Sequence, residues 1–102
     1  MLTGLVVDAD TGKPIPAAFV GVLKPGVTAD QFFGAPDGEL IVARGVSGAS
    51  GLYRTAPAIA RGQAYSIVVG ADGYEARGFD DVRLPADAPE VIELGDVALR
   101  RL

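Results

Sequence analysis

The feature that most constrains this chain is the regular interruption of short apolar runs by Gly, Pro and Asp. The runs are about five to eight residues long and rich in Val, Ile and Tyr, which is typical of β-strands and too short for most globular helices. The 14 Gly and 7 Pro residues lie between the runs rather than in one block. Such spacing indicates turns and not disorder. The sequence therefore predicts an all-β protein.

Seven runs are predicted to form strands, and their spacing favours a seven-stranded Greek-key β-sandwich in a single domain over residues 1–102. The predicted strands span residues 3–8, 17–23, 39–46, 52–55, 63–70, 74–84 and 91–99. The run 17–23 is apolar on both faces and is predicted to be a central strand. The polar run 74–84 is predicted to lie at a sheet edge, and residues 85–89 to form a loop.

The connection over residues 24–38 is long for a sandwich and contains a helix-start pattern. Thr28 and Gln31 have the spacing of a capping box, in which each side chain binds the backbone amide of the other. Gly34 is a suitable helix stop. We predict one short helical turn near residues 28–33.

Two adjacent aromatic residues, Phe32 and Phe33, lie in this connection and are the first candidates for a binding site. Loops are usually polar, so such a pair requires either burial or a partner. One interpretation is that the rings plug the open end of the sandwich. The other is that they form an exposed patch that docks a protein or a sugar.

The chain has no Cys and no His. This excludes disulfides, thiolate and imidazole metal sites, and the common Ser-His-Asp and Cys-His catalytic groups. No serine lies in a G-x-S-x-G motif. Asp8 and Asp10 flank one turn, but two carboxylates are too few for a calcium loop. We expect no enzyme activity, no metal and no cofactor.

The net charge of −4 comes from scattered acidic residues, so a nucleic-acid partner is not expected. The adjacent basic pair Arg100-Arg101 is expected to be solvated. No apolar stretch approaches the ~18 residues of a membrane span, so membrane insertion is not expected. The start, Met1 to Gly4, lacks the basic and apolar regions of a signal peptide, and the compartment stays open on these grounds.

An ordered set of turn motifs covers nearly the whole chain. Gly4–Asp8 (GLVVD) is followed by Thr11–Val20 (TGKPIPAAFV). Three further motifs follow. A glycine turn before an aromatic residue lies at Ser47–Tyr53, and the entry to the next strand lies at Arg61–Ile67. A Gly-Tyr pair lies at Gly73-Tyr74. In this order the motifs resemble those of carboxypeptidase regulatory-like domains.

The resemblance implies a transthyretin-like sandwich that serves as an accessory module of peptidases, surface proteins or receptors. It favours an extracellular or periplasmic location and a partner that is another protein or a domain of the parent chain. The L-K-P-G-V-T stretch at residues 23–28 and the D-G-Y turn at residues 72–74 are similar to modules of secreted bacterial trypsin-like proteases.

Four residues are predicted to shape the turns. Gly12 and Gly51 permit positive φ, and Gly73 forms a hairpin-type turn with Asp72. Pro14 is predicted to keep the incoming segment from pairing. The chain also departs from the family pattern. Ala17 replaces a common Gly, and Gly48 stands where Asp is usual, so a role of that Asp in capping or metal binding is absent. A purine-pathway hydrolase of the same fold is excluded, since the resemblance implies that it needs His.

Two alternative functions stay open. The chain could be a self-standing protein that oligomerises through its sheet edges. It could also be a carbohydrate-binding module, although Trp is absent. Because Tyr53 and Tyr65 alternate with core positions, Tyr74 is the main candidate for an aromatic contact with a sugar.

Overall fold

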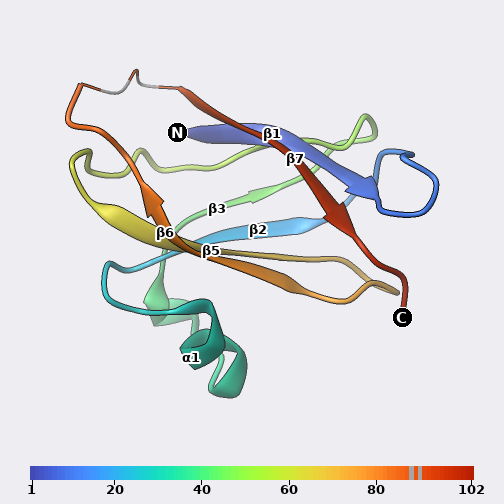
Figure 1. The fold of residues 1–102 in the computed structure, drawn as a ribbon, viewed down its shortest axis with the longest axis horizontal. Helices are drawn as coiled ribbons and strands as arrows, with labels where there is room; N and C mark the ends of the chain where they lie inside the picture. The colour runs from blue at the N-terminus through green and yellow to red at the C-terminus, as the bar shows by residue number, and fades with distance from the viewer. Residues whose placement is uncertain (88, 90) are drawn as a thin grey trace.

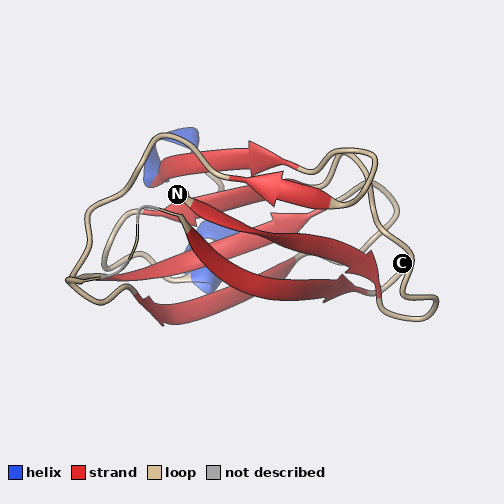
Figure 2. Ribbon diagram, turned by 90° about the horizontal axis from the view of Figure 1, so that it is seen from above, coloured by secondary structure: helices blue, strands red, loops and turns tan. Residues whose placement is uncertain are grey.

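The computed structural model describes residues 1–87, 89 and 91–102, and it forms a sandwich of two β-sheets (Figures 1 and 2). The first sheet has the order β4-β1-β7 and the second the order β3-β2-β5-β6. The strands are β1 (Leu2–Asp8), β2 (Phe19–Leu23), β3 (Ile41–Val46), β4 (Leu52–Arg54), β5 (Ala64–Gly70), β6 (Arg77–Arg83) and β7 (Ile92–Leu99). The predicted seven-stranded all-β sandwich is confirmed for the described residues.

The order of strands in the larger sheet also agrees with the sequence pattern. β2 pairs antiparallel with both β3 and β5, and nearly every residue of it is buried, as expected of a central strand. β6 lies at the sheet edge, as its polar sequence predicted. In the smaller sheet, β1 pairs antiparallel with β4 and parallel with β7.

The two sides of the sandwich differ. On one side, β3 and β4 are neighbours along the chain and a bridge between Arg44 and Ala56 joins the two sheets. On the other side, the edge strands β6 and β7 face each other without pairing. This second side is therefore the open one.

The main core fills the space between the sheets. Its buried members are Leu2, Val6, Ile15, Ala18, Val20, Val22, Ala43, Tyr53, Tyr65, Ile67, Val69, Leu84, Val97 and Leu99. A smaller cluster of Leu23, Ala29 and Val68 lies on the other face of the larger sheet, beneath helix α1 (Ala29–Gly34). Burial of apolar surface in both clusters stabilises the fold.

Helix α1 begins as predicted. Thr28 Oγ1 accepts from the Gln31 amide at 3.1 Å, and Gln31 Oε1 accepts from the Thr28 amide at 3.0 Å. Both halves of the capping box are thus formed. The short helix in the long connection is confirmed.

β2 and β3 each begin two residues later than predicted. β2 begins at Phe19 rather than Ala17, because Ala17 has a φ of +58°, outside the strand region. β3 begins at Ile41 rather than Glu39, because Gly38–Leu40 form a 3-10 turn, η1. Asp37 caps this turn by accepting from the Glu39 amide at 2.9 Å.

β6 is shorter than predicted. It covers Arg77–Arg83 instead of 74–84, since Tyr74 belongs to a turn and forms an isolated bridge with Arg101. The predicted loop at 85–89 follows β6, although residue 88 lies outside the described residues.

Gly12 and Gly51 adopt the predicted positive φ, with values of +71° and +79°, and Gly73 in its turn has a φ of +80°. Gly51 is also required sterically, since a Cβ there would lie 2.9 Å from the Cβ of Pro14.

The prediction for Pro14 was wrong. Lys13 O accepts from the Asp8 amide at 2.8 Å, and the Ile15 amide donates to Val6 O at 2.9 Å. Pro14 itself forms a bridge with Val7. The segment therefore pairs with β1 on both sides of the proline, because proline removes only its own donor.

Candidate functional site

Helix α1 lies on the outer face of the larger sheet, where Asp80 of β6 ties it down (Figure 1). Asp80 Oδ1 accepts from the Ala29 amide and from Ser66 Oγ, both at 2.8 Å. These hydrogen bonds, first that from Ala29, hold the pKa of Asp80 below its usual range. A single carboxylate thus joins α1, β5 and β6.

Gly78 of β6 allows the helix to approach the sheet closely. A Cβ at Gly78 would overlap the Cβ of Ala29 and would lie 3.2 Å from Cε2 of Phe33. Ala29 is buried at this contact. The helix position therefore depends on the absence of a side chain at Gly78.

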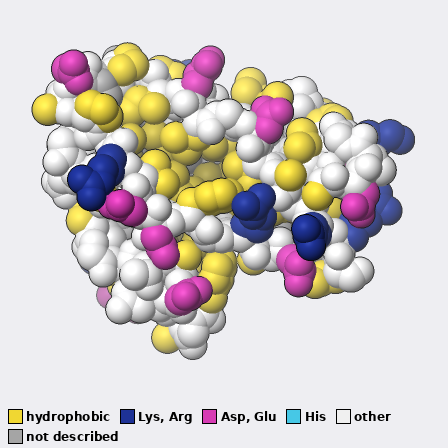
Figure 3. All heavy atoms as spheres, viewed as in Figure 1, with side chains coloured by type: hydrophobic (Ala, Val, Ile, Leu, Met, Phe, Trp, Pro, Cys, Tyr) yellow, Lys and Arg dark blue, Asp and Glu magenta, His cyan; other side chains and the backbone are white. Residues whose placement is uncertain are grey.

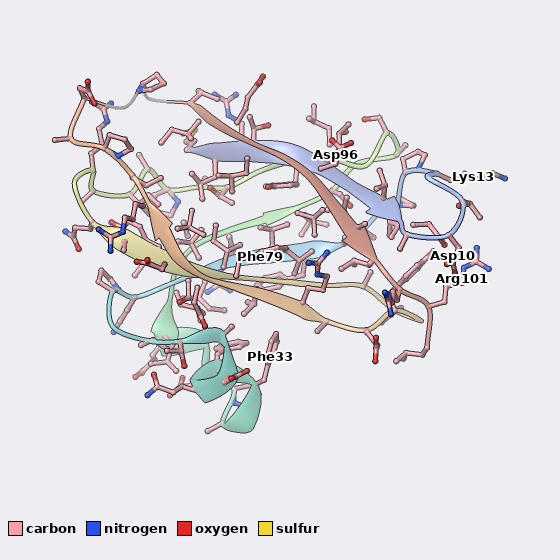
Figure 4. All side chains as sticks on the ribbon, in the orientation of Figure 1. Asp10, Lys13, Phe33, Phe79, Asp96 and Arg101 are labelled. Carbon is pink, nitrogen blue, oxygen red and sulfur yellow. The ribbon has the colours of Figure 1, made fainter. Side chains whose placement is uncertain are left out.

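The two phenylalanines have different environments. Phe32 is half-buried and packs against the cluster of Leu23, Ala29 and Val68. Phe33 is 41% exposed, and its ring meets that of Phe32 edge to face, with 6.2 Å between centroids. Figure 4 shows Phe33 on α1, away from the space between the sheets. We call Phe32 and Phe33 the aromatic platform.

The interpretation in which the rings plug the open end of the sandwich is therefore wrong. The platform covers the outer face of the larger sheet, because Val68 points to that face while Ile67 and Val69 point into the main core. Strand alternation decides this placement.

Exposed acidic side chains accompany the platform. Asp30 lies in the first turn of α1, and Asp37 and Glu39 lie in the segment that follows the helix. All three are exposed. The connection that carries the platform therefore has three exposed negative charges.

Tyr74, the third predicted binding residue, lies apart from the platform. Its ring is half-buried against the main core, and its hydroxyl donates to Asp8 Oδ2 at 2.9 Å. The structure thus engages the polar end of Tyr74 inside the domain rather than leaving it free.

Asp8 is a buried anchor for three segments of the chain. Oδ2 also accepts from Arg101 Nε at 2.8 Å, and Oδ1 accepts from the amides of Asp10 at 2.8 Å and Thr11 at 3.1 Å. The guanidinium of Arg101, followed by the other hydrogen bonds, holds the pKa of Asp8 well below its usual range. Arg101 is exposed, as expected of a solvated residue, and its guanidinium also forms this ion pair.

An apolar groove of about 210 Å³ opens between β6 and β7, and we call it the β6–β7 groove. It is lined by Tyr53, Ile67, Phe79, Val82, Leu94, Asp96 and Val97. Figure 3 shows it as a hollow lined by hydrophobic side chains, and Figure 4 places Phe79 and Asp96 on its opposite walls. Sequence reasoning missed it because its residues come from four strands, and no local pattern joins them.

The described residues contain no cluster of three Asp, Glu, His or Cys side chains with the geometry to hold a metal ion. Within the described part of the chain, no helix is both long enough and apolar enough to traverse a bilayer.

No protein-family model matches the chain, and no curated protein matches it. Solved structures do show a similar fold. The Bacillus anthracis TIE protein superposes with a TM-score of 0.53 and 16% identity, over 99% of this chain and 17% of that one. The 3-chlorocatechol 1,2-dioxygenase from Rhodococcus opacus 1CP gives 0.52 and 14%, over 99% and 59%. At these identities the similarity concerns the fold alone.

Proposed function

We propose that this chain is a non-catalytic accessory module whose aromatic platform docks on a protein partner. The observation that carries the proposal is Phe33, which is 41% exposed on a helix that is fixed to the sheet through Asp80 and Gly78. An aromatic side chain held at the surface by a rigid scaffold loses little entropy on binding and is a frequent interface hot spot.

The charge around the platform defines the partner further. Asp30, Asp37 and Glu39 add exposed negative charge to the connection that carries this apolar centre. The complementary surface has an apolar side chain flanked by Lys or Arg, because opposite potentials across an interface favour association. We assign this surface to a partner protein or to another domain of the parent chain.

The accessory role draws support from two sources. The turn motifs resemble carboxypeptidase regulatory-like domains, whose transthyretin-like, Greek-key sandwiches are appended to secreted or surface proteins. The chain also spans only 17% of the TIE protein and 59% of the dioxygenase, so in both of these proteins the fold is part of a longer chain. An extracellular or periplasmic location is part of this proposal.

A second candidate function is self-association through sheet edges. It is favoured by Val46 of β3 and Leu52 of β4, which are 62% and 54% exposed on edge strands of the two sheets. Carbohydrate binding receives less support, because the Tyr74 hydroxyl is already bonded to Asp8.

Site-specific photo-cross-linking in the full-length native protein tests the docking proposal. A photoreactive benzoylphenylalanine replaces Phe33, and a matched variant carries it in place of Val46, which is more exposed but lies on β3. We expect a discrete cross-linked protein, or an intrachain cross-link to another domain, only from position 33. An excess of the chain without the photoreactive residue should suppress this cross-link by competition, whereas an excess of its Phe33→Ala variant should not.

Two results would contradict the proposal. One is equal cross-linking from positions 33 and 46. The other is a stable dimer in light scattering that Val46→Lys dissociates and Phe33→Ala leaves intact, which would support self-association instead.

A further inference from the structure

We propose that the β6–β7 groove binds a small, uncharged, apolar molecule that carries a hydrogen-bond acceptor, and that Tyr53 donates to that acceptor. The proposed site is separate from the aromatic platform, since it lies between the sheets rather than on the outer face of the larger one. It therefore stands independently of the docking proposal.

The hydroxyl of Tyr53 is the central observation. Tyr53 is 1% exposed, and its oxygen has no hydrogen-bond partner among the described residues. Buried polar groups are nearly always paired, and leaving one unpaired costs free energy. The other buried tyrosine, Tyr65, follows this rule by donating to Ala60 O at 2.7 Å.

The ring of Tyr53 runs from β4 across β1 toward the open side. Gly4 of β1 is its pairing partner, and a Cβ there would lie 2.8 Å from the Tyr53 oxygen and 2.5 Å from Gly95 O of β7. Gly4 thus leaves room for the hydroxyl beside β7. Tyr53 also lines the groove, and its unpaired hydroxyl is buried at the inner wall. We infer that the acceptor of a bound molecule reaches the hydroxyl from the groove.

Both walls of the groove carry a β-bulge. The pairing of β1 with β7 shifts between Thr3 and Leu5, and Gly95 in the shifted part of β7 has a φ of +81°. The pairing of β5 with β6 shifts between Tyr65 and Ile67, and Asp81 has a φ of +57°. Bulges bend strands and are frequent beside binding sites. Here they flank the groove on both edge strands.

The size and the lining define the ligand class. A dry apolar cavity of ~150 Å³ holds a benzene molecule, so a groove of about 210 Å³ accommodates one ring with a short substituent. Asp96 is the single charged side chain of the lining, and it is exposed. A carboxylate at that position disfavours anionic ligands. We therefore assign an uncharged acceptor, such as a ketone.

The test compares two probes of similar shape by NMR titration: acetophenone, which carries a ketone, and ethylbenzene, which does not. Each is titrated into the native protein and into Tyr53→Phe, which keeps the ring and removes only the donor. We expect saturable shifts at Phe79, Val82 and Leu94. In Tyr53→Phe, the dissociation constant of acetophenone should rise by about threefold to tenfold relative to that of ethylbenzene.

Location and charge are tested separately. Val82→Trp fills the groove and should abolish the shifts, whereas Val46→Trp, on an exposed edge of β3, should not. Phenylacetate should bind more weakly than acetophenone.

Three results would overturn the proposal. The first is an unchanged ratio of the two probes in Tyr53→Phe, and the second is phenylacetate binding as tight as that of acetophenone. The third is a concentration-dependent dimer that covers Phe79 and Leu94 and excludes both neutral probes, since the occupant would then be a second copy of the chain.

Discussion

Asp8, at the end of β1, forms an ion pair with Arg101, and 2.8 Å separates Oδ2 of the aspartate from Nε of the arginine. The carboxylate is 3% exposed and also accepts from the Tyr74 hydroxyl. One buried charge thus holds the C-terminal segment and the Asp72-Gly73 turn region against β1. The pH dependence of folding should report this contact.

The first prediction concerns acid stability. Because the pKa of Asp8 is lower in the folded protein than its usual value of 3.8, the ionised form stabilises the fold fully above about pH 4. This contribution is lost as the pH falls further. Asp8→Asn should lower the free energy of unfolding at pH 7 and flatten its decline below pH 4, measured by urea denaturation.

Asp80 has a lowered pKa as well, so Asp8→Asn should reduce the acid dependence without removing it. Asp10→Asn, at an exposed side chain of the same turn, is the control. Equal acid profiles for Asp8→Asn and the native protein would refute the role of Asp8.

The second prediction concerns Ala17, which has a φ of +58° and an exposed side chain. The left-handed region costs an L-residue roughly 1–2 kcal/mol, and glycine avoids this at an entropic cost of about 0.5–1 kcal/mol. Ala17→Gly should therefore stabilise the protein by about 0.5–1 kcal/mol in thermal or urea unfolding. The neighbouring variant Ala18→Gly removes a fully buried methyl group and should destabilise it instead.

The third prediction concerns Ser47, which fixes the segment before β2. Its buried Oγ accepts from the Ala18 amide at 2.8 Å and donates to Ile15 O at 2.6 Å. Ser47→Ala leaves both backbone groups unpaired and should cost about 1–3 kcal/mol. Ser50→Ala, at an exposed position of the same turn, should change the stability by less than ~0.5 kcal/mol. Similar losses for the two variants would contradict this assignment.

The fourth prediction separates the two rings of the aromatic platform. Phe32 packs on the cluster beneath α1, so Phe32→Ala should destabilise the protein by about 2 kcal/mol, less than a fully buried ring would. Phe33 is 41% exposed, and Phe33→Ala should cost less than ~1 kcal/mol. If urea denaturation shows the reverse order, Phe33 is a packing residue and not a docking one.

The fifth prediction concerns the contact between α1 and β6. Gly78→Ala adds a methyl group where Ala29 already lies and should cost about 1–3 kcal/mol. Hydrogen exchange should show faster exchange at residues 29–34 with little change in β1. Gly38→Ala, where an added Cβ meets no atom within 4 Å, is the control.

The local elements of this fold could be predicted because their causes are local. The run at residues 63–70 was predicted to be a strand, and its alternate residues Tyr65, Ile67 and Val69 all lie in the main core. The capping box of Thr28 and Gln31 defined the start of α1, since both partners lie within one helical turn. The family pattern also singled out position 17, where the backbone has the conformation that glycine favours.

The sites depend on contacts between distant parts of the chain. Asp8 and Arg101 are 93 residues apart, and Asp80 and Ala29 are 51 apart, so no spacing in the sequence indicates either contact. The same holds for the β6–β7 groove, whose walls come from different sheets.

The sequence by itself therefore determined that this chain is all-β, where its strands and short helix lie, and that it lacks the residues of common catalytic sites. Only the tertiary structure decided that Phe32 is half-buried while Phe33 is exposed, and that the hydroxyl of Tyr53 is unpaired beside an open groove. The reason is physical: strand and turn formation follow from neighbouring residues, whereas burial and pairing are set by the packing of two sheets and a helix.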